Sequence, residues 1–388
     1  MSLQHYIPAG FLGRFSSDVT IKSNRDKVIA VADLAKDKAV FQTKAAGIGG
    51  INNFYDIVNM PGDPKRLDRS WNGYEVSLNV AIDSTIKGTL DAVSWSRILV
   101  PFITGLMVRG PEFDTRYMQR PIVAALSSFH DAPNHITMAR VFEMQRLLGP
   151  ILTGEWYIAK TSGNIPLITN DVGFVPFLHK ESHKCGAAIP VDQRHVIVVV
   201  ARTTGRVLTK VNEVWYPLIC PVDLEDADNH GINVSVAKGA RRFIYGGSVT
   251  EVEQYRSYFD SSDLATIEPA HMGFVSGLNS RDHEFTWHRL ISFLYDATKS
   301  GSYKNFPIDW AALDDDNFWS PLMMVPLEAR PFCPTSITQE ENAIVVDLSE
   351  VPEASKKPVQ SYVERTWLGP GKLYSEVHPP GDERLNNT

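Results

Sequence analysis

The chain has 388 residues, of which 43% are hydrophobic and 21% are charged, with a formal net charge of −7 at pH 7 and a pI near 5.9. This composition is typical of an ordinary soluble protein and argues against both intrinsic disorder and a surface dominated by nucleic-acid binding. Because domains usually span about 100–200 residues, the length predicts two or three of them.

The acidic charge is concentrated in the last third of the chain. Residues 263–388 contain 10 Lys and Arg against 19 Asp and Glu, whereas residues 1–262 contain 28 against 26. The acidic part is also rich in proline, and a helical pattern is visible there over about 287–298. We therefore predict a main domain over 1–262 and an acidic accessory region over 263–388, which is suited to docking a protein partner or masking a site.

The cysteines, the chain start and the apolar stretches bear on localisation. Cys185, Cys220 and Cys333 lie far apart with no C-x-x-C, so they predict neither a disulfide framework nor a cysteine zinc site. The start lacks the basic and apolar regions of a signal peptide, and the longest apolar stretch, 98–108, is too short to cross a bilayer. We expect a cytoplasmic protein with no membrane segment.

The chain opens with an aromatic and aliphatic run that is unusual for a terminus. Residues 4–16 place Tyr, Ile, Phe and Leu side chains around His5. Since chain ends usually fray, this run predicts that the N-terminus is tied into the core. Short β-prone runs follow at 28–32, 39–43 and 54–58, and they predict a small antiparallel sheet.

Three helices are predicted in the central part of the chain. From residue 66 to about 91, apolar side chains recur at three- and four-residue steps. Similar spacing predicts helices over about 95–109 and about 137–148, with Pro101 near the start of the first of these two. These helices form the central layer of the predicted fold.

The second half of the chain alternates strands and helices. Apolar runs predict strands at 155–159, 165–169 and 195–201, the last of them unbroken and therefore buried. Helices are predicted over about 232–245 and about 251–259. The predicted fold class is α+β, with a small N-terminal antiparallel sheet, a central helical layer, a mixed β-rich second half and an irregular C-terminal extension.

Two charged residues fall on the apolar faces of the predicted helices. At about 100° per residue, Glu75 lies about 40° from Trp71, and Arg109 lies about 40° from Trp95 on the next helix. An isolated charge in an apolar setting costs several kcal/mol, so buried charges need partners. The two residues predict an ion pair, which either locks two helices together or lines an active site.

Asp171 and His5 complete the candidate site residues. Asp171 ends an apolar strand and enters a loop, a usual position for a functional carboxylate, with an Asx turn or a helix cap as the alternative. His5 is suited to act as a general base or a metal ligand, with a hydrogen bond to the backbone as the alternative. Together, His5, Glu75 and Asp171 offer the ligands that a divalent cation such as Mg²⁺ or Mn²⁺ accepts, and Arg109 is suited to bind a phosphate.

Several motifs occur in an order that resembles domain-of-unknown-function family 4238. Residues 4–8, followed by Phe11, Leu12 and Phe15, resemble the family's His-Tyr-Val-Pro signature. Further landmarks follow in the family's order, at 53–56, Glu75, 109–111, 168–171, Asn233 and 240–245. Gly173 departs from the pattern, because it stands where the family's turn has a proline. The resemblance covers about residues 4–260 and implies shared residues without a known reaction.

Two functions are compatible with these residues. The first is a metal-assisted phosphoester hydrolase, such as a nuclease, acting on nucleic acid or a phosphorylated small molecule. In it His5, Glu75, Arg109 and Asp171 are catalytic, and His5, Glu75 and Asp171 hold the cation. The second is a non-enzymatic ligand- or partner-binding module in which the pair of Glu75 and Arg109 is structural. Hydrolysis requires all four side chains around one cavity, which a structure can test.

Overall fold

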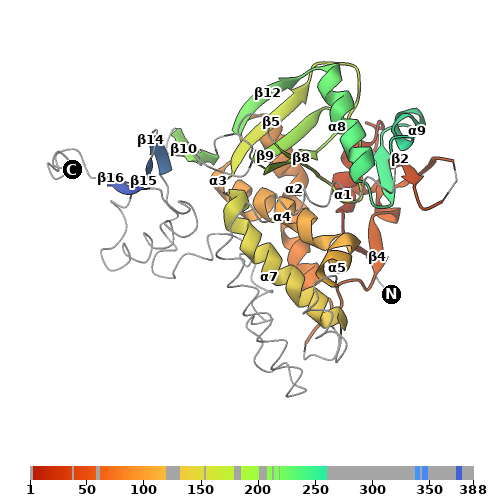
Figure 1. Ribbon diagram of the computed structural model, residues 1–388, viewed down its shortest axis with the longest axis horizontal. Coiled ribbons are helices and arrows are strands. Elements are labelled where there is room, and N and C mark those ends of the chain that lie inside the picture. Colours follow the sequence, from red (N-terminus) through yellow and green to blue (C-terminus); the bar gives the residue numbers. More distant parts are fainter. Residues whose placement is uncertain are drawn as a thin grey trace.

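The computed structural model describes residues 3–36, 39–57, 62–118, 132–152, 154–178, 185–200, 208–211, 214–217, 219–259, 337–340, 343–347 and 373–377. These residues form helices together with antiparallel and mixed sheets, which confirms the predicted α+β class (Figure 1). The predicted boundary near residue 262 and the predicted helix over 287–298 lie outside the described residues, so the division into two domains stays a prediction.

A five-stranded mixed sheet forms the centre of the second half. Its strands are β12 (Ile219–Leu224), β5 (Glu155–Thr161), β9 (His195–Val200), β8 (Cys185–Pro190) and β7 (Val175–Leu178), in that order across the sheet. The pair β12 and β5 is parallel, and the other pairs are antiparallel. Because β9 lies in the middle, Ile197 and Val199 pack on one face and Val196 on the other, which explains the unbroken apolar run.

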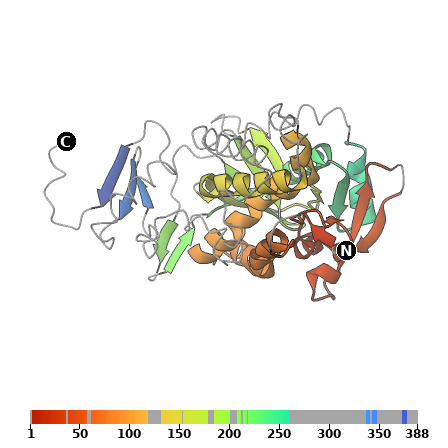
Figure 2. The ribbon, with the colours of Figure 1, turned by 90° about the horizontal axis from the view of Figure 1, so that it is seen from below.

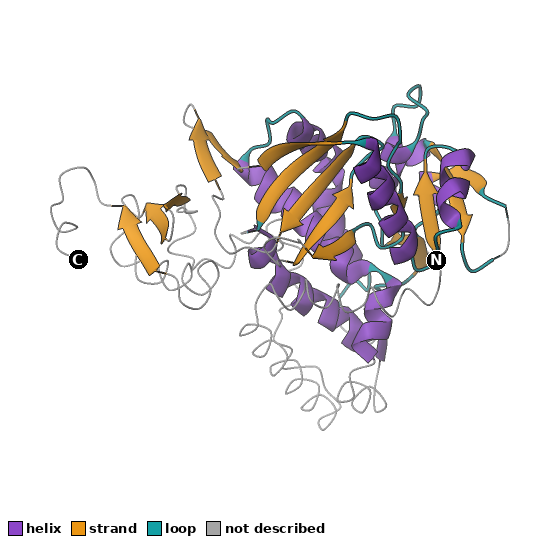
Figure 3. Cartoon of the chain, turned by 45° about the horizontal axis from the view of Figure 1, so that its top comes forward, coloured by secondary structure: helices purple, strands orange, loops and turns teal. Residues whose placement is uncertain are grey.

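Helices cover both faces of this sheet (Figure 3). On one face lie α2 (Arg66–Ile86), α4 (Val100–Arg109) and α7 (Ala132–Leu152), and α8 (Asp226–Gly239) lies against the other. In Figure 2, α7 in yellow lies against the orange helix α4, and α4 in turn contacts α2. None of the helices in the described part of the chain combines the length and the hydropathy that a membrane crossing requires.

A second, antiparallel sheet lies beside the first. Its strands are β3 (Phe41–Lys44), β2 (Val28–Asp33), β13 (Phe243–Gly246) and β6 (Thr169–Asn170), in that order. Helix α9 (Val249–Arg256) packs on β2 and β13. The pairing of β2 with β3 confirms the predicted N-terminal antiparallel strands.

The remaining elements are short. They are β1 (Leu3–His5) paired with β4 (Gly50–Asn52), α1 (Ala9–Leu12), α3 (Ala92–Ser94), a π-helical turn at Trp95–Leu99, α5 (Pro111–Met118), the hairpin of β10 (Leu208–Val211) and β11 (Val214–Pro217), and a sheet of β14 (Ile337–Glu340), β15 (Ala343–Asp347) and β16 (Leu373–Val377). Single 3-10 turns occur at Gly13–Phe15, Asn24–Asp26 and Ala45–Gly47. The π-helical turn runs directly into α4, so the helix predicted over 95–109 is present with a change of winding after Leu99.

Two predicted elements differ from the structure because of local backbone conformation. Helix α2 stops at Ile86 rather than near 91, because Gly88 follows in the left-handed region with φ of 69° and terminates the helix. The strand predicted at 54–58 is wrong over its described residues, where Asn53, with φ of 53°, leads into a turn. Tyr55 is nevertheless fully buried, so its aromatic character served the core rather than a strand.

The helix predicted over 232–245 is wrong in its second part. Helix α8 begins earlier, where Glu225 and Asp228 form a capping box, and it ends at Gly239. Residues 243–246 form β13 instead, whose apolar side chains are buried between β2 and β6.

The strand predicted at 165–169 is reduced to the two residues of β6. Side chains of α8 bind the backbone that precedes it: Asn229 Nδ2 donates to the Ile165 carbonyl at 3.1 Å, and Asn233 Nδ2 donates to the Pro166 carbonyl at 2.8 Å. These side-chain amides take the place of strand partners, so the backbone carbonyls of Ile165 and Pro166 are hydrogen-bonded without a neighbouring strand.

The N-terminal run is tied into the core, as its composition predicted. Ile7, Phe11, Leu12 and Phe15 are almost fully buried in the same apolar cluster as the helices of the central layer. The rings of Phe11 and Phe102 lie 5.0 Å apart, which links the chain start to α4. The segment 3–15 therefore has a fixed position beside α2 and α4.

Candidate functional site

A stripe of polar residues runs along one side of α2, next to its apolar face. Asp68, Asn72, Glu75 and Asn79 follow one another at steps of four, three and four residues, so they share one side of the helix. The apolar face beside the stripe is formed by Leu67, Trp71, Tyr74, Leu78 and Ala81, which are buried. The core thus fixes the rotation of α2 and directs the polar stripe toward the N-terminal segment.

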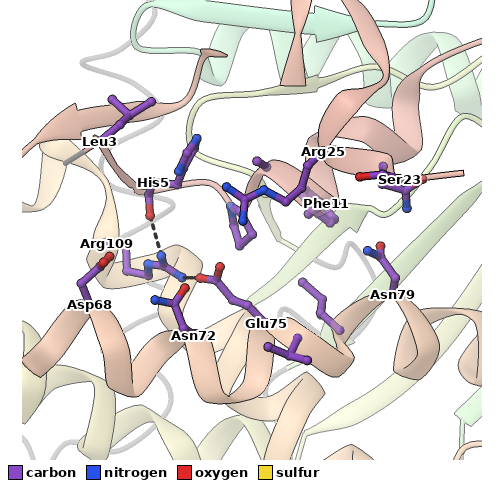
Figure 4. Close-up of a pocket in the computed structure, with 16 residues that line it drawn as sticks. Leu3, His5, Phe11, Ser23, Arg25, Asp68, Asn72, Glu75, Asn79 and Arg109 are labelled. Carbon is purple, nitrogen blue, oxygen red and sulfur yellow. Dashed lines mark hydrogen bonds and ion pairs between the residues drawn. The ribbon is translucent and has the colours of Figure 1, made fainter. Parts of the chain in front are cut away.

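This stripe forms one wall of a cavity of about 460 Å³ (Figure 4). The opposite wall comes from the N-terminal segment, with His5, Gly10 and, on a short turn, Arg25. A Cβ on Gly10 would lie 3.1 Å from Asn79 Nδ2 on the opposite wall. Glycine at this position therefore leaves the space between the two walls open. The volume falls within the range of about 300–1,000 Å³ that is usual for small-molecule sites.

Glu75 and Arg109 form the predicted ion pair at the base of the cavity. Arg109 Nη1 donates to the Glu75 carboxylate and to Tyr74 Oη, and Nη2 donates to the carbonyl of His5 at 2.5 Å. The guanidinium also lies 4.6 Å from the centre of the Trp71 ring. Burial disfavours its charge, but Glu75 and the neighbouring tyrosines outweigh that effect and raise the pKa of Arg109.

His5 lies on the cavity wall with its ring bound to the backbone. Its Nε2 is 3.2 Å from the carbonyl of Ala46, which can only accept, so this nitrogen carries the proton. Burial lowers the pKa of His5, and the nearby charges of Arg25 and Arg109 add to this effect. The imidazole is therefore neutral at physiological pH and has the backbone bond that we gave as the alternative to catalysis.

Asp171 lies apart from this cavity, in the buried turn after β6. Its two carboxylate oxygens accept from the backbone amides of Arg241 and Arg242, each at 2.8 Å. Burial raises the pKa of Asp171 to about 7, although these amide bonds work in the opposite direction. The structure thus brings His5, Glu75 and Arg109 together and leaves Asp171 out.

The predicted metal ligands are consequently not assembled at one point. Across the residues that the structure describes, no group of three or more His, Cys, Asp or Glu side chains is placed to hold a metal ion. Of the three predicted ligands, Glu75 is engaged with Arg109 and Asp171 with backbone amides.

The turn after Asp171 explains why Gly173 stands where the family has a proline. Gly173 adopts φ of 81°, which a proline ring cannot reach, and its amide donates to Asn170 Oδ1 at 2.9 Å. A Cβ at this position would lie 2.9 Å from Leu106 Cδ2 and 3.0 Å from Ile7 Cδ1. The turn therefore depends on glycine for both conformation and space.

We expect Gly173→Ala to lower the free energy of unfolding by about 1–3 kcal/mol, through backbone strain and overpacking. Gly88→Ala is the matched control, because Gly88 has a similar φ of 69° and open space where the Cβ would lie. Urea denaturation should show a smaller loss for the control. Equal losses in both variants would show that the contacts with Leu106 and Ile7 carry no cost.

Three residues of the polar stripe were not among the predicted site residues. The side chains of Asp68 and Asn72 have no hydrogen-bond partner among the described residues, and the buried Oδ1 of Asn79 also has none there. The repeat of Asp, Asn, Glu and Asn at one helical side was visible in the sequence and is the signal that could have identified them.

These features define an α+β protein with a polar cavity between its N-terminal segment and α2. The chain belongs to the family described as protein of unknown function DUF4238, because the family's profile matches residues 3–250, more than half of the chain. This confirms the resemblance carried by the opening motif. The residues that line the cavity fall within the matched region. No curated protein and no solved structure matches the chain.

Proposed function

We propose that this protein is a binding module for a small polar molecule, which it holds in the cavity between the N-terminal segment and α2. The observation that carries the proposal is a set of side chains on α2, without hydrogen-bond partners among the described residues, that line a cavity of ligand size. Asn79 Oδ1 is buried and Asp68 is half-buried, whereas Asn72 is exposed at the mouth of the cavity. Because buried polar groups are normally hydrogen-bonded, this wall is suited to a ligand that supplies the missing partners.

The same geometry gives less support to a phosphoester hydrolase. That function depended on four side chains around one cavity, and Asp171 lies outside it. Arg109 also has its Nη donors engaged with Glu75, Tyr74 and the His5 carbonyl, so it is not placed to grip a phosphate with two parallel hydrogen bonds. The pair of Glu75 and Arg109 fits a structural role at the base of a binding site.

We also propose a cytoplasmic location for this binding function. Cys220 is exposed and free, and an exposed free thiol fits a reducing compartment. The wide spacing of the three cysteines in the sequence points the same way.

A cavity-filling substitution tests the proposed function. We expect at least one member of a panel of amino acids, nucleosides, nucleotides and sugars to raise the melting temperature of the full chain, and Asn72→Phe to abolish that shift. A ligand at about 100 times its Kd stabilises by about 2.7 kcal/mol, which a thermal melt detects. Val80→Phe adds similar bulk to an exposed position of α2 outside the cavity and should keep the shift.

The proposal fails if no panel member shifts the melting temperature of the wild type. It also fails if Asn72→Phe responds to the same molecule as strongly as Val80→Phe does.

A further inference from the structure

The two walls of the cavity carry opposite net charge. On α2 the cavity has two carboxylates, Asp68 and Glu75, and the ion pair with Arg109 compensates one of them. Asp68 remains, half-buried, with no hydrogen bond among the described residues. Across the cavity Arg25 is exposed and forms no ion pair with a described residue.

Arg109 cannot serve as the anion-binding group of this site. Its side chain is 3% exposed, and both terminal nitrogens donate to protein oxygens. Arg25, by contrast, reaches over the cavity from the opposite wall (Figure 4). It is close enough to His5 for its charge to lower the pKa of that imidazole. Within the described part of the chain, the cation of the cavity that is left unpaired is therefore Arg25, on the wall that faces α2.

The environment of Asp68 favours a cationic partner. Burial raises the pKa of Asp68, the charge of Arg109 opposes this effect, and Glu75 adds to it. A ligand ammonium or amidinium beside Asp68 would form a charge-assisted hydrogen bond and offset the cost of its burial. Asn72, one helical turn further along the stripe, offers an amide to the same ligand group.

We infer that the cavity binds a small zwitterion, with its cationic hydrogen-bond donors against Asp68 and Asn72 and its anionic group at Arg25. This inference rests on the proposed function. A ligand with cationic groups alone would bring like charge to Arg25, and a ligand with anionic groups alone would face the carboxylates. Like-charge contacts of this kind cost several kcal/mol, so a zwitterion matches both walls where the others match one.

Four probes with the same five-carbon skeleton test the charge pattern on the full chain. They are 5-aminopentanoate, 1,5-diaminopentane, pentanedioate and 1,5-pentanediol, which are a zwitterion, a cation, an anion and a neutral molecule. We expect NMR titration at low salt to show 5-aminopentanoate binding at least about tenfold more tightly than each of the others, since about 1.4 kcal/mol is a factor of ten.

Two substitutions assign the two ends of the probe. Asp68→Asn should weaken 5-aminopentanoate at least about tenfold and leave pentanedioate unweakened. It keeps the shape of the side chain, which has no hydrogen bond to a described residue that the substitution would remove. Arg25→Gln should weaken 5-aminopentanoate similarly and strengthen 1,5-diaminopentane. Lys22→Gln is the matched control, because Lys22 is exposed in the same segment and does not line the cavity.

The outcomes separate this inference from the proposed function. The inference of a zwitterionic ligand is wrong if the cation, the anion or the neutral probe binds most tightly, or if all four probes bind equally. The cavity would then still be a binding site. The inference is also wrong if all four probes fail and a nucleoside, nucleotide or sugar of the panel binds in a manner that Asn72→Phe abolishes. If an amino acid binds instead, the inference holds only when Asp68→Asn and Arg25→Gln each weaken that amino acid, and it is overturned otherwise. If neither the probes nor the panel bind, both the inference and the proposed function are wrong.

Discussion

Replacing Arg109 by alanine is expected to lower the free energy of unfolding by about 3–5 kcal/mol, the usual cost of removing one partner of a buried ion pair. The side chain is 3% exposed, and its loss leaves Glu75, which is 17% exposed, without its partner. The hydrogen bond to the His5 carbonyl is lost as well, so β1 loses its tie to α4. Denaturant titration followed by tryptophan fluorescence measures the change.

Two further variants separate the cost of the unpaired carboxylate from the loss of packing. Arg25→Ala removes an exposed arginine from the same cavity and should change stability by less than about 0.5 kcal/mol. In the Arg109→Ala background, Glu75→Gln removes the uncompensated charge and should recover at least about 1 kcal/mol. A loss below about 1 kcal/mol for Arg109→Ala alone would contradict a structural pair.

The pairing of Glu75 with Arg109 could be predicted because it depends on local periodicity. Each residue lies on the apolar side of its own helix, and the 3.6-residue repeat places both toward the core without knowledge of the fold. The neighbouring Asp68 and Asn72 could not be recognised in this way. Polar residues beside an apolar face are ordinary in an amphipathic helix, and the N-terminal segment that makes them cavity residues lies about sixty residues earlier in the chain.

Long-range pairing explains most of what the sequence did not predict about the fold. Strand β13 pairs with β2, which precedes it by more than two hundred residues, and no local pattern encodes this partner. A run that was expected to continue α8 became a strand because the sheet buries both of its sides. Tertiary context overrides helix propensity in such a segment.

Another long-range contact decides the role of Asp171. Its position at the end of an apolar run was visible in the sequence, but its partners are backbone amides that follow α8, about seventy residues later. Asp171 therefore forms neither the Asx turn nor the helix cap given as the alternative from sequence, although its carboxylate does bind the backbone. The difference has a measurable consequence, because a buried carboxyl links stability to pH.

We expect the stability advantage of the wild type over Asp171→Asn to fall as the pH rises from about 4 to about 7. The pKa of Asp171 is raised by burial from 3.8 to about 7, so in this window the folded protein keeps a proton that the unfolded chain releases. Stability is therefore greatest below the unfolded pKa and declines until the pH reaches the folded pKa. Three pKa units correspond to at most about 4 kcal/mol.

Asp171→Asn removes this titration and also orients an amide donor toward one of two backbone N–H groups. The variant should be less stable than the wild type by about 1–3 kcal/mol at pH 4, from the unsatisfied donor, and should approach or exceed it at pH 7. Denaturation at several pH values measures both curves, and their difference cancels the other groups that titrate. A difference that stays constant over this window would mean that the two amide bonds outweigh burial and keep Asp171 ionised throughout.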